Sequence, residues 1–120
     1  MKYRSGRIAA TAALVSMAAP AQAQICEINF GGRLGIGKDG SLQVDFVSAG
    51  IVTICSMTAT ERGVSKEACA AWFSALLSFR LAKVRARFYF SAADPGNANV
   101  TTCAQLGDWS ARTPYFLEAY

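Results

Sequence analysis

Four cysteines are the feature of this sequence that most restricts its fold. They are widely spread, and the two nearest, Cys55 and Cys69, stand 14 positions apart, with Cys26 and Cys103 further out. A zinc site with four thiolates is the alternative, but structural zinc sites bring cysteines together in pairs about two to four residues apart. An even number of cysteines in a small exported chain instead predicts two disulfides.

Four cysteines allow three pairings, and the sequence alone does not choose between them. We favour Cys55–Cys69 together with Cys26–Cys103. The first bond would close a short loop, which in the chain-entropy model stabilises a fold by about 3 kcal/mol. Such bonds matter in a chain of this size, because a small domain buries only a modest fraction of its surface.

Residues 1–23 have the three parts of a secretory signal peptide. A basic start is followed by an apolar stretch from Ile8 to Ala19, and Ala21-Gln22-Ala23 has the small-x-small form that signal peptidase accepts. A membrane anchor is the alternative, but the apolar stretch is shorter than the ~20 residues that span a bilayer. We therefore expect a secreted or periplasmic protein with one mature domain, residues 24–120, and no transmembrane segment after cleavage.

The charge of the chain changes when this segment is removed. The full sequence has 12 Lys+Arg and 8 Asp+Glu, a net charge of +4 that would suit a nucleic-acid partner. Lys2, Arg4 and Arg7 leave with the signal peptide, so the mature chain keeps 4 − 3 = +1. We therefore expect no nucleic-acid partner.

Alternating apolar residues and glycine turns predict a β-meander at the start of the mature chain. Its strands are Ile25–Phe30, which bends at Gly31-Gly32 and resumes at Leu34, then Leu42–Phe46 and Ile51–Met57. The turn before the second strand contains Asp39-Gly40, a strong hairpin signal.

A helix is predicted over residues 66–82, with Ser65 as its N-cap. Trp72, Leu76 and Phe79 form one apolar stripe, and small residues form a second. Because the helix is apolar nearly all round, we expect it to be covered on more than one side, within its own core or in a homo-oligomer.

Further strands are expected after the helix. These are Val84–Phe90, a short strand within Thr101–Trp109 that carries Cys103, and a closing strand over Tyr115–Tyr120. The expected order is β-β-β-α-β-β, with or without one more short strand, in a mostly β, α+β domain.

Catalysis has little support in this sequence. There is no His, so no imidazole can act as a general base or metal ligand, and no cofactor or metal site is predicted. Gly35 to Gly40 matches G-x-G-x-x-G, but a strand follows it where a dinucleotide site needs a helix. A hydrolase that uses its scattered carboxylates is the weakest of the functional hypotheses.

The strand over Val84–Phe90 carries the best candidates for ligand binding. Arg85, Arg87 and Tyr89 share one face of it, where two guanidiniums and a phenol can bind anions or stack on a sugar. The alternative is the solvated outer face of an antiparallel strand. Trp109 is a second candidate, because a loop aromatic can stack on a pyranose, although packing in the core or at an edge explains it as well.

The order of a meander, a central helix and further strands resembles the OB-fold, a small barrel that binds oligosaccharides or oligonucleotides. The segments Ile54 to Met57 and Val84 to Tyr89, with the aromatic helix between them, are similar to the binding (B) subunits of pentameric bacterial toxins of the pertussis and subtilase type. The chain also resembles small exported bacterial proteins of no known activity that share Cys69-x-Ala71-Trp72, Cys103-x-x-Leu106-x-x-Trp109 and Pro114-Tyr115-Phe116.

These observations give two main hypotheses. In the first, the protein is a non-enzymatic OB-like barrel, stapled by disulfides, that recognises a glycan or another anionic ligand; the toxin resemblance implies a ring of five subunits on host-cell glycans. In the second, it is a structural or inhibitory envelope protein that contacts a protein partner through the helix or a strand edge.

Overall fold

The structure is a computed structural model that describes residues 23–120, so the predicted signal peptide lies outside the described residues apart from Ala23. The described part has one α-helix, a short 3-10 helix and seven strands. In chain order these are β1 (Gln24–Glu27), β2 (Leu34–Ile36), β3 (Ser41–Phe46), β4 (Gly50–Ser56), α1 (Lys66–Ala82), β5 (Ala86–Phe90), η1 (Cys103–Leu106), β6 (Ser110–Ala111) and β7 (Pro114–Ala119).

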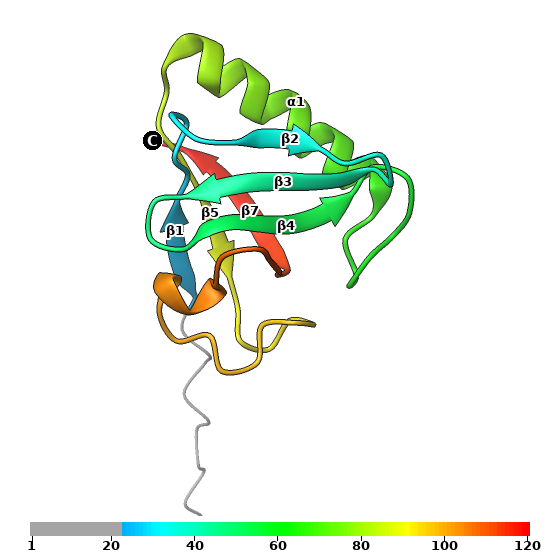
Figure 1. The fold of residues 1–120 in the computed structure, drawn as a ribbon, viewed down its shortest axis with the longest axis vertical. Helices are drawn as coiled ribbons and strands as arrows, with labels where there is room; N and C mark the ends of the chain where they lie inside the picture. The colour runs from blue at the N-terminus through cyan, green and yellow to red at the C-terminus, as the bar shows by residue number, and fades with distance from the viewer. Residues whose placement is uncertain (1–22) are drawn as a thin grey trace, which may run out of the picture.

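The strands form two sheets, one of order β1-β5-β7 and one of order β2-β3-β4-β6. Figure 1 shows the first behind the second, with the strands of the two sheets crossing steeply and α1 lying along one end. The domain is therefore α+β and mostly β, as the sequence predicts.

The meander consists of β2, β3 and β4, as predicted from Leu34 onward. The predicted strand Ile25–Phe30 does not belong to it, because β1 pairs with β5 in the other sheet. The amide of Gly40 donates to the carbonyl of Gly37 at 2.9 Å, and Gly40 has a φ of 86°, which a residue with a Cβ rarely adopts. The glycine-rich run thus makes the hairpin between β2 and β3. In this turn the backbone amide of Ser41 donates to Asp39, and this hydrogen bond lowers the pKa of the Asp39 carboxyl.

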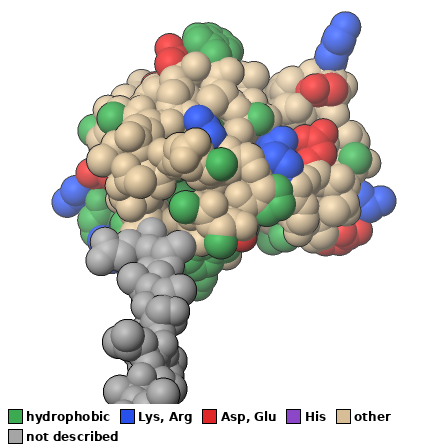
Figure 2. All heavy atoms as spheres, turned by 90° about the horizontal axis from the view of Figure 1, so that it is seen from below, with side chains coloured by type: hydrophobic (Ala, Val, Ile, Leu, Met, Phe, Trp, Pro, Cys, Tyr) green, Lys and Arg blue, Asp and Glu red, His purple; other side chains and the backbone are tan. Residues whose placement is uncertain are grey.

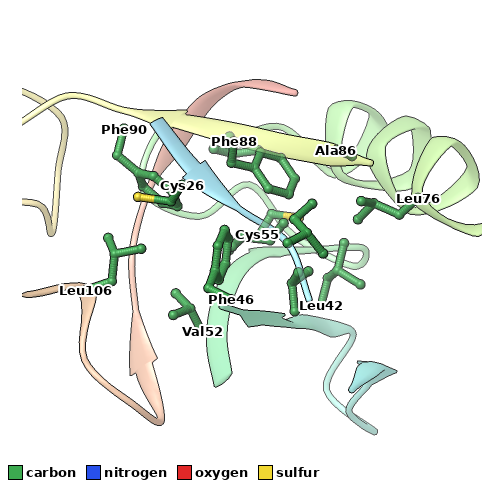
Figure 3. Packing of buried hydrophobic residues seen from close by; sticks show 14 of the residues in the cluster. Cys26, Leu42, Phe46, Val52, Cys55, Leu76, Ala86, Phe88, Phe90 and Leu106 are labelled. Atoms are coloured by element: carbon green, nitrogen blue, oxygen red, sulfur yellow. The ribbon is translucent and has the colours of Figure 1, made fainter. Parts of the chain in front are cut away.

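The core lies between the two sheets. Figure 3 shows Phe88 from β5 and Phe46 from β3 directed into the same space, and their ring centroids are 6.0 Å apart. The Trp72 ring of α1 adds an edge contact to Phe88 at 5.3 Å. Alternation on β5 buries Ala86, Phe88 and Phe90 and leaves Arg87 and Tyr89 on the outer surface.

The α-helix has the predicted bounds and the predicted cap, because the Ser65 hydroxyl accepts from the amide of Ala68 at 3.0 Å. Only one of its sides is covered within the described chain. Cys69 and Leu76 are fully buried, whereas Leu81 is 85% exposed. The expectation that the helix is covered on more than one side is therefore not met by residues 23–120 alone.

Both disulfides have the pairing favoured from the sequence. Cys26–Cys103 joins β1 to η1 across 77 positions, and Cys55–Cys69 joins β4 to α1 across 14. The two bonds therefore tie the 3-10 helix to one sheet and the α-helix to the other.

The two sheets remain separate in the structure. The sheets touch at one corner, through a bridge between Ile28 and Phe46, but they do not close into a barrel, so the OB-like barrel is not confirmed. The last two strands of the chain belong to different sheets, because β6 pairs with β4 and β7 pairs with β5.

The predicted strand within Thr101–Trp109 is wrong, since this segment forms turns and η1. The side chain of Gln105 accepts hydrogen bonds from the amides of Thr101 and Thr102, which closes the segment on itself. Among residues 23–120, no helix is long and apolar enough to cross a membrane.

Candidate functional site

The outer surface of the β1-β5-β7 sheet carries the predicted ligand residues in a regular grid. Arg87 of β5 stands between Glu27 of β1 and Glu118 of β7, and Tyr89 stands between Ile25 and Phe116. Arg85 precedes β5 and lies opposite Tyr120, whose amide donates to the Arg85 carbonyl at 2.9 Å. The structure therefore brings Arg85, Arg87 and Tyr89 together on one surface.

Each arginine of this grid has a carboxylate partner. Arg85 Nη2 lies 2.8 Å from Glu27 Oε1, and Arg87 Nη2 lies 3.0 Å from Glu118 Oε1. These hydrogen bonds, to Glu27 and to Glu118 respectively, raise the pKa of each guanidinium. The two positive and two negative charges cancel, so the grid has no net charge.

Glu118 also accepts a hydrogen bond from the hydroxyl of Tyr89. This bond, followed by the one from Arg87, lowers the pKa of Glu118, and the same contact raises the pKa of Tyr89. Tyr89 therefore stays protonated at neutral pH, as a hydrogen-bond donor rather than a base or a nucleophile.

Aromatic side chains surround the ion pairs. The Tyr120 ring lies 4.8 Å from the Arg85 guanidinium and 4.3 Å from that of Arg87, within the range of a cation–π contact. Tyr89 makes edge contacts with Phe116 at 5.3 Å and with Tyr115 at 6.0 Å. Tyr115 reaches this surface because a bulge shifts the pairing of β7 between Tyr89 and Phe90.

We call this surface the aromatic face. It consists of the two ion pairs Arg85–Glu27 and Arg87–Glu118 and the side chains Ile25, Tyr89, Tyr115, Phe116 and Tyr120. Ile25 and the last three aromatic residues are between 43% and 50% exposed, which is unusual for a cluster of large apolar groups.

A cleft of about 510 Å³ borders the aromatic face at Arg85 and Glu27. It is also lined by Arg80 and Lys83 from the C-terminal end of α1. Within residues 23–120 neither of these cations has a carboxylate within 4 Å, unlike Arg85. Positive charge that is available to an anion therefore lies in this cleft rather than on the grid.

Trp109 does not join this surface. Its amide donates to the carbonyl of Ile51 on β4, and it directly precedes β6, so it belongs to the other sheet. The ring is 62% exposed and lies 5.1 Å from the guanidinium of Arg33. The predicted core or edge packing of Trp109 is therefore absent, and it remains a separate exposed aromatic.

Six residues of the aromatic face were not predicted from the sequence: Ile25, Glu27, Tyr115, Phe116, Glu118 and Tyr120. Phe116, Glu118 and Tyr120 alternate along the predicted closing strand, which signals a shared face. What the pattern did not reveal is that this strand pairs with β5, and only that pairing aligns the two sets of side chains.

Charge elsewhere on the molecule is mixed. Figure 2 shows Lys/Arg and Asp/Glu side chains interspersed on the face seen from below, with no large patch of a single sign. Among residues 23–120, no group of three or more His, Cys, Asp or Glu side chains is arranged to hold a metal ion. No protein-family model, curated protein or solved structure matches this chain.

Proposed function

We propose that this protein is a secreted or periplasmic, non-enzymatic binding module that recognises a glycan through the aromatic face. The observation that carries this proposal is the cluster of exposed aromatic rings beside two preformed ion pairs. Aromatic rings have a large apolar surface that can lie against the C–H face of a sugar, and a phenol also offers a polar group. Guanidinium donors and carboxylate acceptors together match the mixed donors and acceptors of sugar hydroxyls.

Preorganisation supports this proposal. Tyr120 is held against both guanidiniums, and Tyr89 is held by Glu118 and by two neighbouring rings. A surface that is already ordered loses less conformational entropy when it binds a ligand. The disulfide that joins β1 to η1 restrains the sheet further.

The charge of the grid favours neutral sugar units on the aromatic face itself. An anion at Arg85 or Arg87 would have to compete with Glu27 or Glu118, which already bind those guanidiniums, although Arg87 Nε has no hydrogen-bond partner among the described residues. An anionic substituent fits better in the adjoining cleft, where Arg80 and Lys83 have no carboxylate partner among the described residues. The ligand class is therefore a glycan that is mainly neutral where it crosses the sheet.

Export and an OB-like order of elements belong to the same proposal. Two disulfides suit an oxidising compartment, and the segment before Gln24 has the sequence pattern of a signal peptide. A strand meander, one helix and later strands follow the order of the OB-fold.

A second candidate function is contact with a protein partner through α1. Leu77 and Leu81 are exposed on the side of the helix that faces away from the core, although both are large apolar residues. Such positions are common in protein interfaces. Light scattering and pull-down experiments with Leu81→Ser would test this function, because a monomer that captures no partner contradicts it.

A glycan array tests the proposed function. We expect the protein from Gln24 to Tyr120 to bind a defined set of glycans and the Arg85→Ala/Arg87→Ala double variant to lose most of that signal. Trp109→Ala is the matched control, because Trp109 is an exposed aromatic on the other sheet. Binding that survives the double variant, or that is lost in Trp109→Ala alone, would contradict the assignment of the site.

A further inference from the structure

A separate cleft of about 390 Å³ lies at the opposite end of β5 from Arg85. It is formed by the turn before α1, the first part of α1 and the start of β7, and its lining includes Arg62, Trp72, Asp94 and Tyr115. Tyr115 also contacts Tyr89 at 6.0 Å, so this cleft adjoins the aromatic face. Its volume is in the range of small-molecule sites, about 300–1,000 Å³.

The cleft contains opposite charges that are not paired with each other. Within residues 23–120, Arg62 Nε and Nη2 and Asp94 Oδ2 are buried without any hydrogen-bond partner. The nearest carboxylate oxygen to Arg62 is Glu61 Oε2, 3.6 Å from the remaining nitrogen, Nη1. Buried charged groups without partners are unfavourable, and native structures rarely keep them without a reason.

The free atoms of Arg62 are those of one edge of its guanidinium. The N–H groups of Nε and Nη2 point in the same direction and can bind both oxygens of a carboxylate at once. Asp94 Oδ2 is an acceptor and needs a donor such as a hydroxyl. A ligand that satisfies both residues therefore carries a carboxylate for Arg62 and a hydroxyl for Asp94.

A hydrogen-bonded turn fixes the backbone position of Arg62 beside the cleft. Glu61 and Val64 exchange two hydrogen bonds, of 3.1 and 2.9 Å, across a tight turn in which Arg62 has a φ of 49°. This left-handed conformation is unfavourable for a residue with a Cβ, and such strain gathers at functional positions. Gly96 contributes as well, because a Cβ there would lie 3.3 Å from Arg62 Cδ.

We propose that this cleft binds an acidic monosaccharide unit of the uronic-acid class, as part of the glycan that crosses the aromatic face. The unpartnered atoms of Arg62 and Asp94 are covered in this structure, so both side chains must turn toward the cleft when the ligand binds. The sugar carboxylate then binds Arg62, a ring hydroxyl donates to Asp94, and the sugar ring lies against Trp72 and Tyr115. An amino acid fits less well, because its ammonium group has three donors for one free acceptor oxygen.

This inference rests on the proposed function, and NMR titration of the 15N-labelled protein with D-glucuronate tests it. We expect the amides of Gly63, Trp72 and Tyr115 to shift, and D-glucose, which lacks the carboxylate, to bind at least about tenfold more weakly. Arg62→Gln should weaken glucuronate binding by at least about tenfold, whereas Lys38→Gln, a change at an exposed cation in the β2–β3 turn, should leave it unchanged.

Several outcomes would overturn the inference. They are equal binding of glucose and glucuronate, unchanged affinity in Arg62→Gln, or equal shifts of the same amides with glycine. If Arg62→Gln does not fold, Asp94→Ala takes its place, and weaker glucuronate binding is expected because this variant has no acceptor for the ring hydroxyl. Array binding that depends on Arg85 and Arg87, without any glucuronate-induced shift of the cleft amides, would contradict this inference and leave the proposed function standing. The absence of all saccharide binding would contradict both proposals.

Discussion

Asn97 is a fully buried polar residue that joins three segments of the chain. Its Nδ2 donates to the carbonyls of Ser91 at 3.0 Å and Thr113 at 2.6 Å, and its Oδ1 accepts from the Thr113 amide at 2.9 Å. Arg112 adds a second clamp, because its guanidinium donates to the carbonyls of Leu106, Gly96 and Gln105. These two side chains hold the loops that lead into β7.

We predict that Asn97→Ala destabilises the protein by about 3 kcal/mol, because it leaves buried backbone groups of Thr113 and Ser91 without partners. Urea unfolding followed by circular dichroism measures this change. Thr60→Ala, at an exposed loop position, should change the free energy of unfolding by less than about 0.5 kcal/mol. Equal stability of the two variants would show that the hydrogen bonds of Asn97 do not stabilise the protein.

Glu118 gives the aromatic face a dependence on pH. Its pKa is lowered in the folded protein by the hydrogen bonds from Tyr89 and Arg87, below an ordinary value of 4.5. A carboxyl with a lowered pKa contributes stability that is present above 4.5 and is lost as the pH falls through its folded pKa. The contacts of the face should therefore weaken in acid.

We predict that Glu118→Gln reduces the loss of stability between pH 5 and about pH 2 relative to the wild type. Thermal unfolding at several pH values measures this difference. An unchanged pH profile would show that Glu118 is not held by Tyr89 and Arg87 in solution.

The residues that share one face of a strand could be predicted from the sequence, as for Arg85, Arg87 and Tyr89. Their partners could not, because Glu27 is 58 positions from Arg85 and Glu118 is 31 positions from Arg87. Alternation identifies one face of a strand, but it says nothing about which strand lies beside it.

At the level of elements, the two disulfides close loops of very different length. In the chain-entropy model a bond across 14 positions contributes about 3 kcal/mol, and one across 77 positions about 4.5 kcal/mol. We therefore predict that Cys26→Ala/Cys103→Ala lowers the free energy of unfolding more than Cys55→Ala/Cys69→Ala does. Equilibrium unfolding of both double variants measures this, and the reverse order would contradict the model.

The helix provides a matched pair of leucines. Leu76 is fully buried and Leu81 is almost fully exposed, yet both lie in α1 and have the same helix propensity. Leu76→Ala should destabilise the protein by about 3 kcal/mol, and Leu81→Ala by less than about 0.5 kcal/mol. A large cost for Leu81→Ala would reveal a contact that covers this side of the helix.

The elements themselves follow from local chemistry to different degrees. The helix could be predicted with its bounds, because Ser65 caps its start and apolar and small residues recur with helical spacing up to Ala82. The left-handed conformation of Lys83, which ends the helix, is seen only in the structure. The segment around η1 could not, because its shape depends on side-chain capping by Gln105 and on the bond from Cys103 to β1. Short apolar runs of this kind do not distinguish a strand from a tight turn.

At the scale of the whole molecule, the two sheets enclose one core and leave the outer surface of β1-β5-β7 open (Figure 1). The meander was predictable because its strands pair with their sequence neighbours. The separation into two sheets was not, because it depends on the division of residues 110–119 between β4 and β5. The proposed glycan site depends on that division, since β7 supplies three of its nine side chains and Tyr120, directly after β7, a fourth.

The most direct test of glycan recognition is an NMR map of the protein titrated with the oligosaccharides that an array selects. The account predicts shifts concentrated at the amides of Arg85, Arg87 and Tyr89 and of Phe116 and Tyr120, with the same shifts lost in Phe116→Ala/Tyr120→Ala. Shifts confined to the β2-β3-β4-β6 sheet, or no shift with any saccharide tested, would contradict it.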